Sequence, residues 1–216
     1  MKKIAILIIT TALIVSACKK DKSTTIVVPV PTISMEVLGP KVVSITIGSS
    51  FVDSYGANFH NETGGIDFIA APTSSDLDLT TTGFYSLTYS AKSQYGYIAK
   101  ASRLVLVTSI SAAKNYSGKY ARASNSQTVT ITKTGPGLYT TDNIGGVAGN
   151  PDYVFPVYFG LINDSVVVIP SQTGSVIGDF KGLGNGKLVR TAVDTTFQWA
   201  LDGTAFGSSL RVFKKQ

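Results

Sequence analysis

The sequence of 216 residues contains a single cysteine, a single histidine and a single tryptophan. With Cys18 as its only thiol, the chain cannot form an internal disulfide bond, so its domains must fold by burying apolar surface. Any Ser-His-Asp or Cys-His catalytic set would depend on His60, and no Gly-x-Ser-x-Gly sequence accompanies it. A zinc site needs three or four converging ligands. We therefore expect no catalytic set, no metal site and no cofactor.

The chain also lacks a basic stripe, although its formal net charge is +6. Many of the lysines lie at the two ends of the chain, namely Lys2, Lys3, Lys19, Lys20, Lys22, Lys214 and Lys215. The remainder is close to electrically balanced. Because nucleic-acid binding needs basic residues gathered on a folded domain, we expect no nucleic-acid partner.

The first residues have the pattern of an export signal. Two lysines precede the apolar run Ile4–Val15, which is shorter than the roughly 20 residues that a membrane-spanning helix needs. The run ends in Val15-Ser16-Ala17-Cys18, which resembles the processing site of bacterial lipoproteins. The resemblance implies a signal peptide over residues 1–17 and a mature chain whose Cys18 carries a diacylglycerol and acyl chains such as palmitate. The alternative is an ordinary secretory signal cleaved after Ala17, with Cys18 incidental.

Residues 18–32 are predicted to form a tether, since their polar start is followed by Pro29-Val30-Pro31, which favours extended geometry. At about 3 Å per residue, this tether could hold the next domain roughly 40 Å from a lipid surface. In Bacteroidota-type lipoproteins, acidic residues after the cysteine commonly mark export to the cell surface, and here only Asp21 is acidic. We expect a lipid anchor in the outer membrane, on either its cell-surface or its periplasmic face.

Residues 33–110 are predicted to form a β-sandwich. Short alternating segments are separated by turn residues and show no helical period. These segments are Ile33–Leu38, Val42–Ile47, Phe84–Tyr89 and Arg103–Val107. In the third of them, Tyr85, Leu87 and Tyr89 share one face.

Several stretches of this region resemble the bacterial immunoglobulin-like repeat, which is related to hyaline-repeat modules. They are Pro31-Thr32-Ile33, Leu38-Gly39, Ile47–Ala57, Thr82–Ala91, Gly96 and Arg103–Val107. The usual proline between Asp53 and Gly56 is replaced by Ser54-Tyr55. The resemblance implies an immunoglobulin-like sandwich of the spacer or adhesive type. It also places Tyr85 as a tyrosine corner, whose hydroxyl bonds to the backbone upstream.

Residues 116–216 are predicted to form a second antiparallel β-sandwich or a small barrel, after a junction at about 112–117. Asp152–Leu161 reads as one aromatic strand, and Gly182–Lys187 as a hairpin turn. The region resembles C-terminal β domains of Bacteroidota lipoproteins, many encoded near glycan-uptake systems. That resemblance rests on the layout and on Ser117–Tyr120, Tyr139-Thr140 and Trp199.

The candidate ligand-binding residues are aromatic, because the apolar C–H faces of sugars pack on flat rings. They are Trp199, Tyr153, Tyr158, Tyr95 and Tyr97. Trp199 shares its strand face with Phe197 and Leu201, which favours a core position, and Tyr153 alternates with other apolar residues. Tyr158 lies on the opposite face. Tyr95 and Tyr97 flank a glycine at a hairpin tip, where burial is harder.

These patterns favour a non-catalytic, membrane-anchored envelope lipoprotein that is an accessory binding protein for a glycan or another envelope ligand. Its expected partners are the membrane, through the lipid, and a polysaccharide or an envelope transporter. The alternative is a structural or protein-interaction lipoprotein without a small ligand. A hydrolase using only the carboxylates Asp76 and Asp78 is a third hypothesis, and His60-Asn61-Glu62 reads as a solvated polar loop.

Overall fold

The structure, a computed structural model, describes residues 32–216. The predicted signal peptide, Cys18 and the tether up to residue 31 lie outside the described residues. The prediction of an all-β fold is confirmed, since strands account for all the regular structure of the described residues except one short 3-10 turn. Residues 32–216 contain no apolar helix of the length that a membrane crossing requires.

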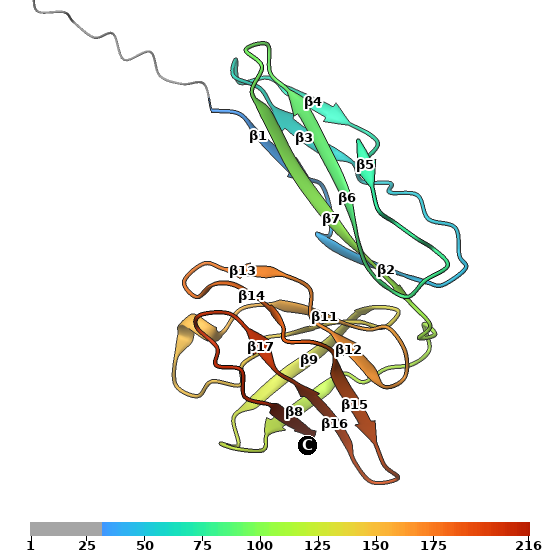
Figure 1. Ribbon diagram of the computed structural model, residues 1–216, viewed down its shortest axis with the longest axis vertical. Helices are drawn as coiled ribbons and strands as arrows, with labels where there is room; N and C mark the ends of the chain where they lie inside the picture. Colours follow the sequence, from blue (N-terminus) through green and yellow to red (C-terminus); the bar gives the residue numbers. More distant parts are fainter. Residues whose placement is uncertain (1–31) are drawn as a thin grey trace, which may run out of the picture. The chain divides into compact units, whose positions relative to one another are not determined.

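The N-terminal module consists of two sheets (Figure 1). A three-stranded sheet has the order β1-β3-β4, formed by Ser34–Val37, Ala57–His60 and Ile66–Ile69. A four-stranded sheet has the order β2-β7-β6-β5, formed by Val42–Thr46, Ile98–Thr108, Gly83–Lys92 and Ser74–Ser75. Strands β2 and β7 run parallel, and the other pairs are antiparallel.

The core of this module follows from the alternation predicted for β6. Leu87 and Tyr89 are buried and cluster with Val37, Ala57 and Val105. On the same strand, the hydroxyl of Tyr85 donates a hydrogen bond of 2.8 Å to the carbonyl oxygen of Thr81. The predicted tyrosine corner is therefore present.

A buried ion pair ties the connection between β2 and β3 to β7, and the same arginine holds the turn between β1 and β2. The Nε of Arg103 lies 2.7 Å from an Asp53 carboxylate oxygen, and the Arg103 side chain is fully buried. The same guanidinium donates to the carbonyls of Leu38 and Pro40, and the Tyr89 hydroxyl donates to Asp53. Because each of these groups has a partner, the module can hold a full positive charge inside its core.

The C-terminal module contains a closed barrel, so the small barrel is the form that this domain takes. Its strand order is β10-β11-β12-β15-β16-β18-β8-β9. The bounds, in that order, are Leu138–Thr141, Val157–Leu161, Val166–Val168, Gly186–Arg190, Thr195–Trp199, Arg211–Lys215, Gly118–Arg122 and Thr128–Gly135. A separate three-stranded sheet is formed by β13 (Gln172–Gly174), β14 (Gly178–Gly182) and β17 (Leu201–Asp202).

Aromatic rings fill the barrel. Trp199 stacks on Phe213 with ring centroids 4.7 Å apart, and Tyr139 stacks on Phe159 at 5.6 Å. The Tyr120 hydroxyl donates a 2.7 Å hydrogen bond to the carbonyl of Tyr116, four residues upstream as at Tyr85. Burial of Tyr120 and Tyr139 raises the pKa of both phenols, that of Tyr139 to about 12. The barrel is therefore a packed core.

Three local expectations are wrong. Asp152–Leu161 is not one strand: a 3-10 turn covers Pro151–Tyr153 and β11 starts only at Val157. The Asn150 side chain caps that turn by accepting from the Asp152 amide, and Pro151 has the fixed φ that suits its first position. The turn after Gly182 joins β14 to β15, which pair with other strands, so it is not a hairpin. His60 is the last residue of β3 rather than a loop residue.

Candidate functional site

Trp199, the sole tryptophan, faces the barrel core. Its side chain is only 1% exposed, and its indole Nε1 donates a 2.9 Å hydrogen bond to the Ile144 carbonyl. A ring that is packed on both faces offers no surface to a sugar. Its candidacy as a ligand contact is therefore wrong, because the strand face that it shares with Phe197 points inward.

Tyr153 and Tyr158 are half-buried. The Tyr153 hydroxyl donates to the Ala205 carbonyl at 3.1 Å, and its ring meets Phe206 edge to face. The backbone of Tyr158 exchanges two 2.8 Å hydrogen bonds with the Gln172 side chain, and its ring packs on a cluster that contains Leu138. Both side chains are committed to structural contacts within the fold.

Tyr95 and Tyr97 are exposed at the turn between β6 and β7. Their exposed fractions are 65% and 49%. Gly96 separates them with a φ of +89°, a left-handed conformation that favours glycine. Ser93 closes the turn, since its amide donates to the Tyr97 carbonyl at 2.8 Å and its hydroxyl accepts from the Tyr97 amide at 3.1 Å. The structure thus presents two rings on a rigid turn.

A hollow lies directly beside this turn, between the β6–β7 turn and the β3–β4 turn. It has a volume of about 250 Å³. We call it the hairpin-tip hollow, and its lining residues are Phe59, Asn61, Glu62, Thr63, Asp67, Lys92, Ser93 and Gln94. Figure 1 shows the two turns at the same end of the N-terminal module. Apart from Phe59, its lining is entirely polar or charged.

The walls of the hollow are held by their own hydrogen bonds. The Asn61 side-chain oxygen accepts from the amides of Thr63 and Gly65, at 3.1 and 2.8 Å, which fixes the β3–β4 turn. Glu62 reaches across to the other turn, where its Oε1 accepts from the Gln94 amide at 3.0 Å. The site is therefore formed before any ligand arrives. The sequence reading of Glu62 as a solvated loop residue missed this tie.

Chemically, this arrangement combines exposed rings with clustered donors and acceptors. Tyr95 and Tyr97 offer apolar faces, while the hollow offers the carboxylates of Glu62 and Asp67 and the ammonium of Lys92. Flat rings beside a few convergent polar groups are what a hydroxyl-rich ring compound needs for binding.

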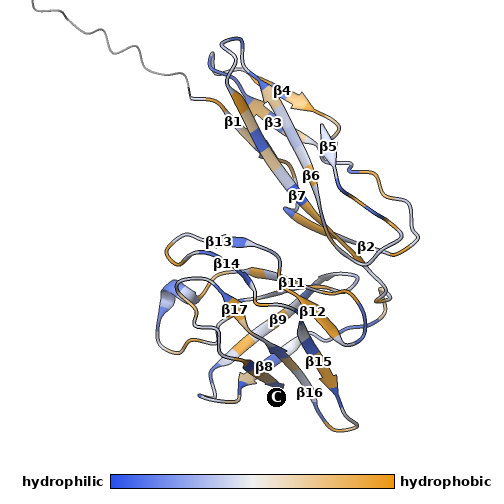
Figure 2. Ribbon diagram, in the orientation of Figure 1, coloured by the Kyte–Doolittle hydropathy of each residue, from blue (hydrophilic) through white to orange (hydrophobic). Residues whose placement is uncertain are grey.

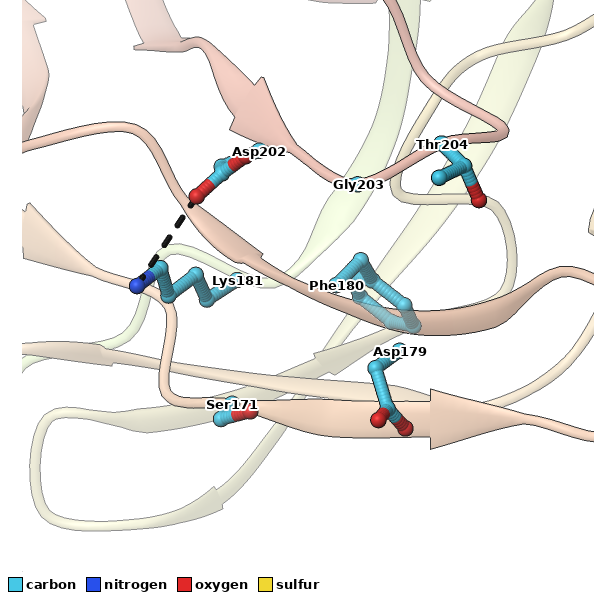
Figure 3. Close-up of a pocket in the computed structure, with 7 residues that line it drawn as sticks. All are labelled: Ser171, Asp179, Phe180, Lys181, Asp202, Gly203 and Thr204. Atoms are coloured by element: carbon cyan, nitrogen blue, oxygen red, sulfur yellow. Dashed lines mark ion pairs between the residues drawn. The ribbon is translucent and has the colours of Figure 1, made fainter.

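A larger hollow, of about 550 Å³, lies on the small sheet of the C-terminal module (Figure 3). Its lining residues are Ser171, Asp179, Phe180, Lys181, Asp202, Gly203 and Thr204. The Lys181 ammonium lies 3.8 Å from the Asp202 carboxylate across strands β14 and β17. Its only aromatic ring, Phe180, is 2% exposed, so this hollow has hydrogen-bonding groups but no ring face for stacking. Sequence reasoning missed it, because β13, β14 and β17 lack a clear alternation.

The carboxylates considered for hydrolysis have structural partners. Asp76 accepts from the Ser86 amide, and Asp78 accepts from the amide and hydroxyl of Thr80. The hydroxyl of Thr80 is the main cause that lowers the pKa of Asp78. Within residues 32–216, no group of three or more His, Cys, Asp or Glu side chains is placed to hold a metal ion.

An edge strand forms a further exposed surface. Strand β4 ends the sheet β1-β3-β4, and Ile66 and Phe68 are each 59% exposed. Figure 2 shows β4 as largely hydrophobic. An exposed apolar edge strand is a template for pairing with an additional strand.

Residues 35–107 match the family described as bacterial surface protein, Ig-like domain. The match covers strands β1 to β7 almost completely and confirms the predicted immunoglobulin-like domain. A crystal structure of a lipoprotein from Bacteroides thetaiotaomicron is 21% identical in sequence and aligns over 86% of this chain and 100% of that chain, with a TM-score of 0.38. A likeness of that degree carries no argument about function. No curated protein matches the chain.

Proposed function

We propose that this protein, whose N-terminal module is an immunoglobulin-like domain of the bacterial surface type, is a lipid-anchored, non-catalytic glycan-binding protein of the cell envelope. The anchor is Cys18, preceded by the signal sequence 1–17, and the membrane is the outer membrane. Two acyl chains make such anchoring stable. The proposal gives the protein an accessory role, in which it holds a polysaccharide near the membrane.

The observation that carries the proposal is the pair of exposed tyrosines beside the hairpin-tip hollow. Tyr95 and Tyr97 can stack on sugar rings while the neighbouring carboxylates and ammonium bind the hydroxyl groups. We therefore assign the glycan site to the immunoglobulin-like module.

Alanine at both Tyr95 and Tyr97 is expected to weaken glycan binding at least about tenfold, or about 1.4 kcal/mol, because both stacking faces are lost. Detergent-solubilised full-length protein would be run in affinity gels that contain single polysaccharides. The matched control is Phe68→Ala, which removes an equally exposed ring from the same module and should leave retention unchanged. Equal retardation of the double variant and the wild type on every retained polysaccharide would contradict the proposal.

The alternative function, a protein-interaction lipoprotein, is favoured by the β4 edge. A partner of this kind would add an extended segment beside Ile66–Ile69 and cover Ile66 and Phe68. We expect Phe68→Lys to abolish recovery of one stoichiometric envelope partner in a pull-down if this function holds. Unchanged recovery by that variant would place the contact elsewhere.

A further inference from the structure

We infer that the hairpin-tip hollow binds neutral glycans through two adjacent hydroxyl groups of one sugar, one accepting from Lys92 and the other donating to Glu62. This inference rests on the proposed function and names its ligand class. Three features carry it: a carboxylate oxygen without a partner, an ammonium without a carboxylate, and an excess of negative charge in the hollow.

The carboxylate is that of Glu62. Its Oε1 accepts from the Gln94 amide, but its Oε2 is buried and has no hydrogen-bond partner among residues 32–216. A buried acceptor that is left unsatisfied is destabilising, and more so when it is charged. A ligand that brings a hydroxyl donor to this oxygen removes that cost. Because Glu62 lines the hollow, its orphan acceptor favours a ligand that carries a donor.

The ammonium is that of Lys92, at the end of β6 on the other wall. Within the part of the chain that the structure describes, it forms no ion pair with a carboxylate. The Lys92 side chain passes close to Gly96, the residue that separates the two exposed tyrosines in the sequence. Lys92 can therefore donate to a ligand oxygen, whereas Glu62 can only accept.

A single sugar can form hydrogen bonds with both Lys92 and Glu62 when two of its neighbouring carbons carry free hydroxyl groups. A hydroxyl is both a donor and an acceptor, so one can accept from the Lys92 Nζ while its neighbour donates to the Glu62 Oε2. Bonds to charged groups are the stronger ones, and this pair would fix the orientation of the sugar. The C–H face of the same ring is then free to lie on Tyr95 or Tyr97.

The net charge of the hollow favours neutral sugars over anionic ones. The carboxylates of Glu62 and Asp67 outnumber the single ammonium of Lys92. A uronic acid or a sulfated sugar would bring a second negative charge to an already negative site, which disfavours binding. Neutral sugars do not meet this repulsion.

The test uses affinity gels with polysaccharides that differ in one feature. Dextran has contiguous hydroxyls in every residue, laminarin has no adjacent hydroxyl pair in its internal residues, and polygalacturonate is anionic. We expect full-length protein to be retained by dextran and not by laminarin or polygalacturonate. Periodate oxidation of dextran followed by borohydride reduction cleaves adjacent hydroxyl pairs and should abolish the retention.

Glu62→Gln keeps an oxygen for the Gln94 amide but puts an NH₂ donor in place of the other oxygen, and Lys92→Met keeps the aliphatic stem without the ammonium. Each variant is expected to lose at least about tenfold in affinity for dextran. Glu62→Gln should also be retained more by polygalacturonate than the wild type is. Lys181→Met, in the other hollow (Figure 3), is the matched control and should bind as the wild type does.

The outcomes separate the two proposals. Equal or stronger retention of the wild type by laminarin or polygalacturonate, or full binding by Glu62→Gln and Lys92→Met, would overturn the hydroxyl-pair inference. If Tyr95 and Tyr97 still mattered in that case, the glycan-binding function would stand. A wild-type protein that no polysaccharide retains would overturn the function and the inference together.

Discussion

Replacing Arg103 with methionine is expected to lower the free energy of unfolding by about 3–5 kcal/mol, the usual cost of breaking a buried ion pair by removing one partner. The Asp53 carboxylate, 2% exposed, would lose its counter-charge inside the core. The carbonyls of Leu38 and Pro40 would lose their donors as well. Methionine fills much of the same volume, so the loss reports charge and hydrogen bonding more than packing.

Urea unfolding followed by far-ultraviolet circular dichroism measures this effect. The matched control is Lys100→Met on the same strand β7, because Lys100 is exposed and forms no ion pair with a carboxylate among the described residues. The control should change stability by less than about 0.5 kcal/mol. An Arg103→Met protein as stable as Lys100→Met would show that the Arg103 contacts are not needed to hold the β1–β2 turn and the β2–β3 connection.

The Arg103–Asp53 ion pair also makes the stability of the N-terminal module depend on pH. Burial acts to raise the pKa of Asp53, but hydrogen bonds from Tyr89, Tyr55 and Arg103 together hold this pKa below its usual value. A carboxyl with a lowered folded-state pKa contributes stability that is present above about pH 3.9 and is lost as the pH falls through the folded-state value. Wild type and Asp53→Asn should therefore differ most at neutral pH and converge in strong acid.

Replacing Trp199 with alanine is expected to cost about 3–5 kcal/mol, the range for large aromatic deletions in a core. The change would remove the stacking on Phe213 and leave the Ile144 carbonyl without its donor. Because Trp199 is the sole tryptophan, circular dichroism must replace intrinsic fluorescence as the measure of unfolding. Val193→Ala, at a position that is 95% exposed, is the control and should be nearly neutral.

A Trp199→Ala protein with unchanged stability but lost dextran retention would contradict the core position of this ring. Such a result would make Trp199 a ligand-binding residue, as the sequence alone allows. The expected result is the reverse, in which stability falls and binding at the hairpin-tip hollow persists below the unfolding temperature.

What the sequence predicts well depends on local signals. The alternation of Leu87 and Tyr89 and the glycine before Phe84 indicated the β6 strand and the tyrosine corner at Tyr85. Tyr120 forms the same bond to a carbonyl four residues upstream. Hydrophobic period and turn chemistry determine such features within a few residues, so a single sequence reveals them.

Contacts between distant segments were not predictable in this way. Arg103 and Asp53 are fifty residues apart, and neither residue carries a local sign that it will be buried. The small sheet of β13, β14 and β17 was missed because its segments are short and rich in glycine and polar residues. The alternation of apolar residues around Tyr153 predicts a strand, but the Asn150 cap and Pro151 determine a turn.

In the candidate site, too, local features were predictable from the sequence and contacts between distant segments were not. A glycine between two tyrosines predicted an exposed hairpin tip, and the exposure of Tyr95 and Tyr97 agrees with it. Glu62 lies thirty-two residues before its partner Gln94, so its part in the site became visible only with the fold. The hydroxyl-pair inference depends on that contact.

At the hairpin tips, the groups that hold the turns differ from the side chains that face a ligand, and this separation has an evolutionary consequence. Inward-facing or backbone groups, mainly Asn61, Ser93 and Gly96, hold the two turns, whereas the outermost side chains contribute little to that frame. Substitutions at Gln94, Tyr95 or Tyr97 should therefore alter what is recognised at little cost to folding. Such a scaffold can diversify its specificity as antibody loops do, while the sandwich beneath it stays constant.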